Sequence, residues 1–314
     1  MTKLVLDITD IKTQVAIDFI AGFDVLEPFI QDNEFWLMRK YLGNTLLNKL
    51  AQVRIPPAEN PNTDGLYDEL LALAQGIIIN RSIMQYIPEG QLDISENGIR
   101  INTTDTKKTA FEWQINKLEK RYLDTANEKI EILLEILFSN DIPQWQDSAI
   151  SKKVRSNFIN SAIQFDKYFS INESHLTFLY FLSHIEYFER VYLRSALGEE
   201  FFLELKEKIA ASEDGYKENA TETDKKYFVL FGLIRAVLVY MSVSITGSEI
   251  KKPDDMDTRA AFAQQQLKEY LDNNSSTDVF TLYFTSSKYT DPLSITATST
   301  GIDNSTLSGC FGAF

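Results

Sequence analysis

The sequence predicts a mainly α-helical protein of two related helical units, with a small β-hairpin in the first unit and an extended C-terminal arm. Three observations carry this prediction. Apolar residues recur at helical spacing along most of the chain, one short segment alternates around Asn-Gly, and the composition changes after Leu271. We predict a first unit over residues 1–141, a second unit over residues 142–272 and the arm over residues 273–314.

The relation between the two units is predicted from residues that recur in the same order. Two Leu-Gly pairs are each followed by three apolar residues at equal spacing: Leu42-Gly43 by Leu46, Leu47 and Leu50, and Leu197-Gly198 by Phe201, Phe202 and Leu205. Two further sets match in the same order: Gly76 and Arg81 with Gly232 and Arg235, and Ala110, Phe111 and Gln114 with Ala261, Phe262 and Gln265. Self-similarity of this kind is typical of a duplicated supersecondary unit.

In the first half, helices are expected over residues 23–50, with an interruption at Gly43, over 66–87 and over 109–138. Leu92 to Ile101 alternates apolar and polar residues around Asn97-Gly98. Because a type I′ turn needs positive φ at both central residues, this pattern predicts a hairpin near residues 92–101.

In the second half, the expected helices are 145–164, 174–196, 199–211, 227–245 and 257–271. The stretch from Tyr227 to Ile245 is nearly long enough to span a bilayer. However, Arg235 lies at its centre, and a central Arg costs about 2.5–3.5 kcal/mol on insertion scales. We therefore expect a buried core helix, and no membrane contact.

The predicted arm, residues 273–314, contains no Glu or Arg and is rich in Ser, Thr and Asn, which compete with helical hydrogen bonds. Residues 280–285 favour a strand, so we expect the arm to become ordered by pairing with a neighbouring subunit. The alternative is a disordered C-terminus. The candidate partner-binding residues are Phe280, Leu282, Tyr283, Phe284 and Tyr289.

Aromatic residues gather between residues 158 and 202, in larger number than one narrow helical stripe can hold. Because aromatic residues are enriched at interfaces, we expect part of this set at a contact between subunits. The alternative is that all of them belong to the core. The candidate interface residues are Tyr168, Phe169, Tyr187, Phe188 and Tyr192.

The negative net charge and the absence of known catalytic motifs argue against several classes of function. The net charge is −14, with 31 basic and 45 acidic residues, which argues against broad affinity for nucleic acid. The lone Cys310 excludes an internal disulfide, and residues 1–10 do not resemble a secretion signal. The sequence has no phosphate-binding glycine motif, nucleophile elbow, HExxH or CxxC. We therefore expect no enzyme activity, no catalytic residue, no cofactor and no metal.

Several segments together resemble neck proteins from phages and prophages of Bacteroidetes-type bacteria. The resemblance covers roughly residues 20–210. Its segments are Leu26 to Ile30, Tyr41 to Gly43, Leu66 to Leu70, the hairpin from Ile94 to Ile101, Thr109 to Gln114, and Phe158 to Ala162 with Phe165 and Tyr168. That family in turn resembles the helical head–tail connector (adaptor) proteins, which form a ring beneath the portal.

The resemblance implies a structural subunit of the virion neck, made in the host cytoplasm. It implies a homo-oligomeric ring of about a dozen copies that contacts portal and tail proteins, while DNA passes through without specific binding. Two alternatives stay open. One is another tail-side or accessory capsid protein, and the other is a monomeric helical adaptor that binds a protein partner. An enzyme is a more distant alternative, which bound metal in the purified protein would indicate.

Overall fold

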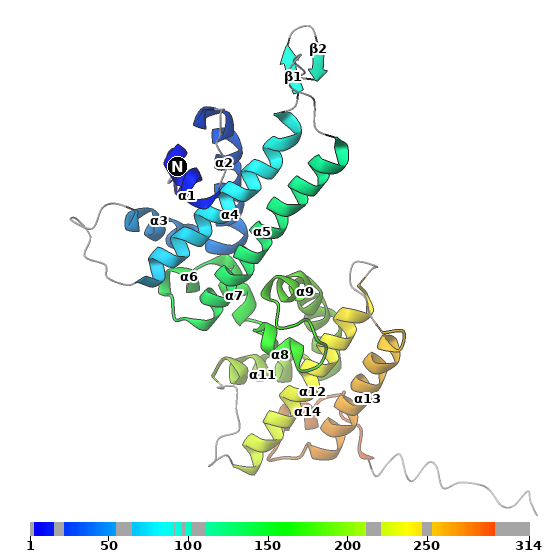
Figure 1. The fold of residues 1–314 in the computed structure, drawn as a ribbon. Helices are drawn as coiled ribbons and strands as arrows, with labels where there is room; N and C mark the ends of the chain where they lie inside the picture. The colour runs from blue at the N-terminus through cyan, green and yellow to red at the C-terminus, as the bar shows by residue number, and fades with distance from the viewer. Residues whose placement is uncertain are drawn as a thin grey trace, which may run out of the picture. The chain divides into compact units, whose positions relative to one another are not determined.

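The computed structural model describes residues 3–15, 22–54, 65–90, 92–95, 98–101, 111–211, 221–246 and 253–292. The fold is mainly α, as the sequence predicts (Figure 1). It forms two compact units: unit 1 comprises residues 1–154 with 174–176, and unit 2 comprises residues 155–173 with 177–314.

The boundary between the units follows Val154, whereas the sequence predicted it after residue 141. The short helix α6 (Pro143–Gln146) therefore belongs to unit 1. Its Trp145 is buried, and the indole N–H donates to the carbonyl of Tyr41 over 2.9 Å. This contact is between residues far apart in the sequence, so helical spacing could not reveal it.

In unit 1 the long helices α4 and α5 lie side by side, and the first three helices pack on α4 (Figure 1). Strands β1 and β2 pair antiparallel, with Leu92 opposite Ile101 and Ser95 opposite Gly98. The elements are α1 (Ile8–Gln14), α2 (Phe23–Leu37), the π-helix η1 (Met38–Leu42), α3 (Asn44–Val53), α4 (Gly65–Glu89), β1 (Leu92–Ser95), β2 (Gly98–Ile101), α5 (Glu112–Ser139), α6 and α7 (Ala149–Arg155).

In unit 2 the longest helices, α12 and α13, again pack together, and α11 packs on α10 and α14. The elements are α8 (Ala162–Asp166), α9 (His175–Phe188), the π-helix η2 (Glu189–Leu193), α10 (Arg194–Leu197), α11 (Glu199–Ala211), α12 (Glu222–Ser244), α13 (Met256–Asn274) and α14 (Thr281–Phe284). In both units a π-helix precedes a glycine at positive φ, Gly43 (φ 77°) and Gly198 (φ 83°). Glycine alone adopts this backbone conformation without strain.

Residues 273–292 are not an extended arm, so that prediction was wrong for this part of the chain. The chain turns after α13 and forms α14, and Phe280 and Tyr283 are buried in unit 2. Phe280 has φ 53°, which is rare for a bulky residue and persists only where packing holds it. Its ring contacts Tyr227 at 4.9 Å and Phe201 at 5.8 Å between centroids. Residues 293–314 lie outside the described residues.

Two helices, α4 and α12, are long and apolar enough to cross a membrane by length and composition alone. The core helix of a folded unit passes the same test. In α4, Ile77, Ile78 and Ile83 are buried within unit 1. In α12, Val237 and Leu238 are buried within unit 2. Burial covers most of the apolar window of α4 but less than half of that of α12, on which Phe228 and Val229 are exposed.

Candidate functional site

The predicted partner-binding residues 280–289 are mostly internal. Phe280 and Tyr283 are buried, and the hydroxyl of Tyr283 donates to Asp272 over 3.1 Å. Burial, with the nearby Asp272 carboxylate, raises the pKa of Tyr283 far above its usual range. Phe284 and Tyr289 are half-buried against each other at 4.8 Å between ring centroids. Among these five residues only Leu282 is exposed.

The predicted interface aromatics divide into two groups. Phe188 is buried, and Tyr168, Phe169 and Tyr192 are half-buried. The hydroxyl of Tyr168 donates to the carbonyl of Gly232 over 3.0 Å. Tyr187, in contrast, is 46% exposed. The structure therefore leaves Tyr187 available to a partner and gives Phe188 a role in packing.

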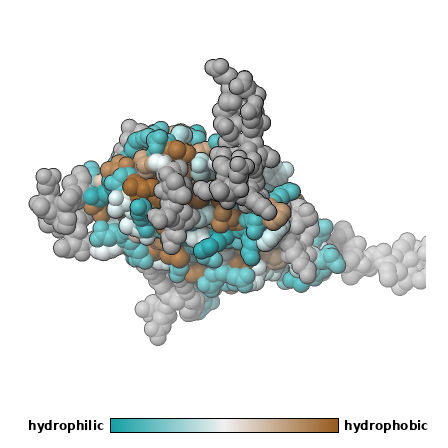
Figure 2. Space-filling model, turned by 45° about the horizontal axis from the view of Figure 1, so that its top comes forward, coloured by the Kyte–Doolittle hydropathy of each residue, from teal (hydrophilic) through white to brown (hydrophobic). Residues whose placement is uncertain are grey.

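The exposed residue Tyr187 belongs to an apolar row along α9 and η2. Tyr180, Tyr187 and Val191 are all exposed and follow at spacings of seven and four residues. Such spacings place side chains on one face of a helix. Large apolar side chains are also exposed on other helices of both units, including Trp113 (63%) at the start of α5 and Phe262 (59%) on α13. The face seen in Figure 2 likewise carries hydrophobic residues among hydrophilic ones.

A second surface, on unit 1, combines aromatic rings with cations, and we call it the cationic face. It comprises Phe35, Trp36, Arg39, Lys40 and Arg81. The guanidinium of Arg81 lies 3.8 Å from the ring centroid of Trp36, and its Nε donates to Asn33 over 3.0 Å. The ammonium of Lys40 lies 5.5 Å from the same ring, and the guanidinium of Arg39 lies 5.3 Å from the ring of Phe35.

The electrostatics of the cationic face show that its charges are uncompensated. Burial, and then the nearby Arg81, lower the pKa of Lys40. Burial also lowers the pKa of Arg81. Within the part of the chain that the structure describes, no carboxylate forms an ion pair with Arg39, Lys40 or Arg81. The face thus holds three cations beside aromatic rings, and none of the three has an ion-pair partner among the described residues.

The cationic face was not among the surfaces predicted from the sequence. Part of it could have been found, because Phe35 and Arg39, and Trp36 and Lys40, are four residues apart on one expected helix. Arg81 lies on another helix, and only the fold brings it to Trp36.

Three carboxylates are buried among the described residues. Asp272 accepts from the hydroxyl of Tyr283 and the N–H of Thr290, whereas Glu34 and Glu189 accept from backbone groups alone or together with a lysine. Glu34 on α2 accepts hydrogen bonds from the N–H groups of Leu4 (2.7 Å) and Val5 (3.0 Å). Glu189 in η2 accepts one from Phe158 (2.6 Å) and forms an ion pair with Lys206. Burial raises the pKa of both glutamate carboxyls. Their hydrogen bonds hold the chain segments that precede α1 and α8, so their roles are structural.

Of the two histidines, His175 contacts Glu131 through Nδ1 at 3.1 Å. His184 lies on α9, and its Nδ1 is buried without a hydrogen-bond partner. In the described ranges, no group of three or more His, Cys, Asp or Glu residues is placed to hold a metal ion.

No curated protein and no solved structure matches this chain. One protein family does match, described as a family of unknown function (DUF6712). The match covers residues 38–155 and 250–303, which is more than half of the chain. The first range contains Arg39, Lys40 and Arg81 of the cationic face, and the second contains α13 and α14. The chain therefore belongs to the DUF6712 family.

Proposed function

We propose that this protein is a structural subunit of the virion neck, a head–tail connector that forms a ring between portal and tail around the DNA channel. The observation that carries the proposal is the exposure of large apolar side chains on helices of both units, including Trp113, Tyr187 and Phe262. Contiguous exposed apolar residues mark interaction sites, and Tyr187 shares one helical face with the exposed Tyr180 and Val191. A chain with such residues on two units suits an assembly in which each copy contacts more than one neighbour.

The proposal includes duplication of one helical unit, which would give the chain two units with which to contact its neighbours. Supporting it, the same pair of hydrogen bonds occurs in each unit. The N–H of Leu4 donates to Glu34 and its carbonyl accepts from Gln75 (2.8 Å). The N–H of Phe158 donates to Glu189 and its carbonyl accepts from Arg235 (2.9 Å). Glu34 and Glu189 are 155 residues apart, the same separation as Gly43 and Gly198.

Burial supports the duplication along the long helices. Buried residues of α4 correspond to buried residues of α12 at a constant separation of 160 residues. The pairs are Leu70 and Leu230, Ala74 and Ile234, Ile77 and Val237, Ile78 and Leu238, Ile79 and Val239, Ser82 and Ser242, and Ile83 and Val243. Similarly, Tyr122, Ala126, Leu133 and Leu137 of α5 correspond to Met256, Ala260, Leu267 and Leu271 of α13 at a separation of 134.

In this function the protein is not an enzyme and needs no cofactor or metal. It contacts copies of itself, the portal and the tail, but no membrane, since α4 and α12 serve as core helices. The net charge of −14 lets DNA pass without adhesion, because like charges repel.

The test is the mass of the purified protein under native conditions, with negative-stain images of the same sample. We expect closed rings, either from the protein alone or after mixing with the portal protein. A chain that stays monomeric in both conditions, and does not bind the portal, would contradict the connector function. A monomer that captures another protein would favour the adaptor alternative.

A further inference from the structure

We infer that the cationic face of unit 1 binds an acidic face of unit 2 on a second copy of this chain, joining neighbours head to tail. The acidic face is the outer side of α11 and comprises Glu200, Leu203 and Glu207. The inference rests on the proposed ring, and it names the surfaces that would hold the ring together.

The cationic face is built to receive carboxylates. Stacking on Trp36 and the hydrogen bond to Asn33 fix the guanidinium of Arg81 before any partner arrives. Arg81 and Lys40 are both partly desolvated, and the lowered pKa of each reflects this. A carboxylate placed between them would relieve the repulsion between the two cations. Trp and Arg are also the residue types most enriched at the energetic centres of interfaces.

The acidic face matches the cationic face in both charge and apolar character. Glu200, Leu203 and Glu207 are exposed and follow at spacings of three and four residues, so they share one side of α11. The opposite side of α11 is buried through Phe201, Phe202 and Leu205. Neither Glu200 nor Glu207 forms an ion pair with any described residue. Leu203 (49% exposed) can pack against the exposed ring of Phe35.

Each unit carries one of the two faces and lacks the other. At the 155-residue separation, Trp36 corresponds to Val191 and Lys40 to Ser195. Arg39 corresponds to Arg194, whose charge is already paired with Glu199. The residues of the acidic face, Glu200, Leu203 and Glu207, correspond in unit 1 to the uncharged residues Thr45, Asn48 and Gln52. A heterologous interface needs two different complementary patches on each chain, and two diverged units supply them.

The overall charge favours a second copy over DNA as the occupant. Residues 1–154 carry 16 basic and 23 acidic side chains, and residues 155–314 carry 15 and 22, so each part has a net charge of −7. Two copies therefore repel one another in general and need a local cationic surface to associate. DNA would be repelled by the same net charge, and three cations neutralise too few phosphates to hold it at physiological salt.

The experiment is a charge swap read by sedimentation of the full chain at several protein and salt concentrations. One variant carries Arg39→Glu and Lys40→Glu, and the other carries Glu200→Lys and Glu207→Lys. Each variant alone should weaken self-association at least about tenfold, because its two faces repel. An equal mixture should associate again, because each variant then finds a complementary neighbour. Added salt should reduce the difference in association between each variant and the wild type, because it screens the charges by which they differ.

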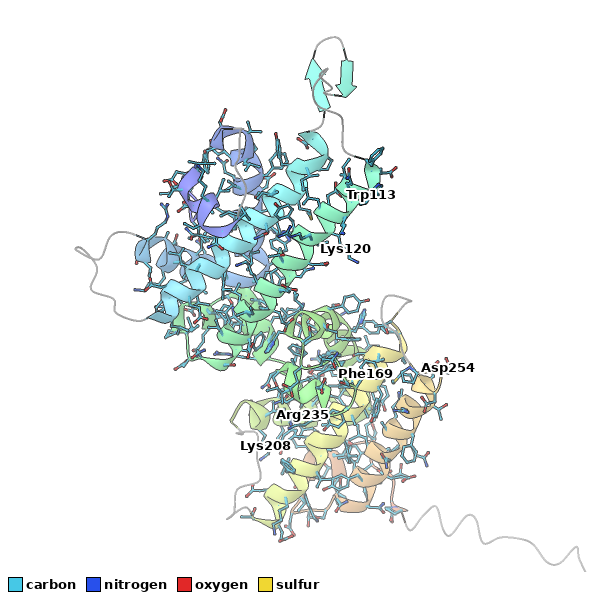
Figure 3. The ribbon with its side chains drawn as sticks, viewed as in Figure 1. Trp113, Lys120, Phe169, Lys208, Arg235 and Asp254 are labelled. Carbon is cyan, nitrogen blue, oxygen red and sulfur yellow. The ribbon has the colours of Figure 1, made fainter. Side chains whose placement is uncertain are left out.

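Two control variants make similar charge changes elsewhere. Lys117→Glu with Lys120→Glu alters exposed residues of α5, and Asp254→Lys with Asp257→Lys alters exposed residues at the start of α13 (Figure 3). Both should associate as the wild type does. Circular dichroism of all variants checks that they fold.

The outcomes separate the inference from the proposed function. Wild-type rings that persist in both charge-swap variants would overturn the inference and leave the connector function standing. A wild type that forms no assembly, alone or with the portal, would overturn both. Charge-swap variants that lose stability but still associate would show that the two faces contact each other within one chain. An equal mixture of the two variants that fails to associate would also overturn the inference. Binding of a short DNA duplex by the wild type, lost in the Arg39→Glu, Lys40→Glu variant, would assign the cationic face to phosphate.

Discussion

Unit 1 and unit 2 each hold a buried glutamate in a similar backbone setting, but they stabilise it differently. In unit 1, one oxygen of Glu34 accepts two backbone N–H groups, from Leu4 and Val5. In unit 2, Glu189 accepts one backbone N–H, from Phe158, and its second oxygen pairs with Lys206. Lys206 in turn donates to the carbonyl of Ser156 over 2.6 Å.

The difference shows that backbone N–H donors can hold a buried glutamate without an ion pair, as at Glu34, and that Glu189 has an ion pair in addition. The addition makes unit 2 dependent on both partners, because removal of one leaves the other buried and charged. In unit 1, removal of Glu34 leaves no such buried partner charge behind. Four comparisons of variants test how far this and other contrasts between the units extend. Each comparison needs a probe that reports the units separately, such as hydrogen exchange read by mass spectrometry.

The largest effect is expected at the end of unit 2. Phe280→Ala should lower the free energy of unfolding by about 3–5 kcal/mol, because it empties a site enclosed by Phe201, Tyr227 and Tyr270. Urea denaturation measures the loss, and hydrogen exchange should place it in unit 2. A change in the core of unit 1, Ile142→Ala, should loosen unit 1 instead. If Phe280→Ala left the free energy of unfolding unchanged, the packing of Phe280 would not matter to the fold, and the region could be a dispensable arm.

Alanine substitutions at the two glycines with positive φ should differ in their cost to stability, because the space around the two glycines differs. A Cβ added at Gly43 would lie 2.6 Å from the Cβ of Ser148, whereas one added at Gly198 would meet Lys288 only at 4.0 Å. Both substitutions strain the backbone, but only Gly43→Ala also displaces a neighbour. We expect a loss of about 3 kcal/mol for Gly43→Ala and about 1–2 kcal/mol for Gly198→Ala, measured by urea denaturation. Equal losses would show that the contact with Ser148 relaxes freely.

The buried glutamates give the next contrast. Glu34→Gln keeps an oxygen for both N–H groups and removes a buried charge, so stability at neutral pH should change by less than about 0.5 kcal/mol. Glu189→Gln leaves Lys206 without its partner and should cost about 2 kcal/mol, less than for a fully buried pair because Lys206 keeps the Ser156 carbonyl. If Lys206→Met, added to Glu189→Gln, recovers the loss, the unpaired ammonium is its cause.

The sequence was sufficient for the helical class and for the positions of the longest helices. Residues 227–245 were expected to be helical and α12 spans Glu222–Ser244, because a long apolar run with few breakers leaves little choice. The sequence also predicts a break between helices at Gly43, and both Gly43 and Gly198 have positive φ. The region after Leu271 was misjudged because composition suggested a strand, whereas the core of unit 2 imposes a turn and a helix.

The residue pairs that the proposed duplication matches between the units are harder to predict from the sequence. The sequence suggested Arg81 as the counterpart of Arg235, but Gln75 makes the hydrogen bond in unit 1 that Arg235 makes in unit 2. Gln and Arg can both donate an N–H group, but they differ in charge and size. A search for identical residues therefore does not pair them. The cationic face was missed for a related reason, because Arg81 meets Trp36 only through the packing of α4 on α2.

The smallest expected effect concerns Glu131 on α5. In the proposed duplication, burial along α5 and α13 aligns Glu131 with the exposed Gln265, in place of the match between Gln114 and Gln265 that the sequence suggests. Burial alone would raise the pKa of Glu131, but hydrogen bonds from His175, Leu176 and Ser174 outweigh it and lower the pKa to about 2. A lowered carboxyl pKa stabilises the folded state above pH 4.5, and this contribution is lost as pH falls toward 2. The partial exposure of Glu131 reduces the expected contribution to about 1 kcal/mol.

Urea denaturation between pH 6 and pH 2 would measure this contribution in the wild type and in Glu131→Gln. We expect the difference in stability between the two proteins to shrink steadily below about pH 4, since protonation removes the charge that the substitution removes. Gln265→Glu supplies the matched control in unit 2. That carboxylate would be exposed and would lack the donors around Glu131, so it should add no comparable acid sensitivity. A constant difference between wild type and Glu131→Gln over the whole range would mean that shape, and not charge, is what α5 requires at residue 131.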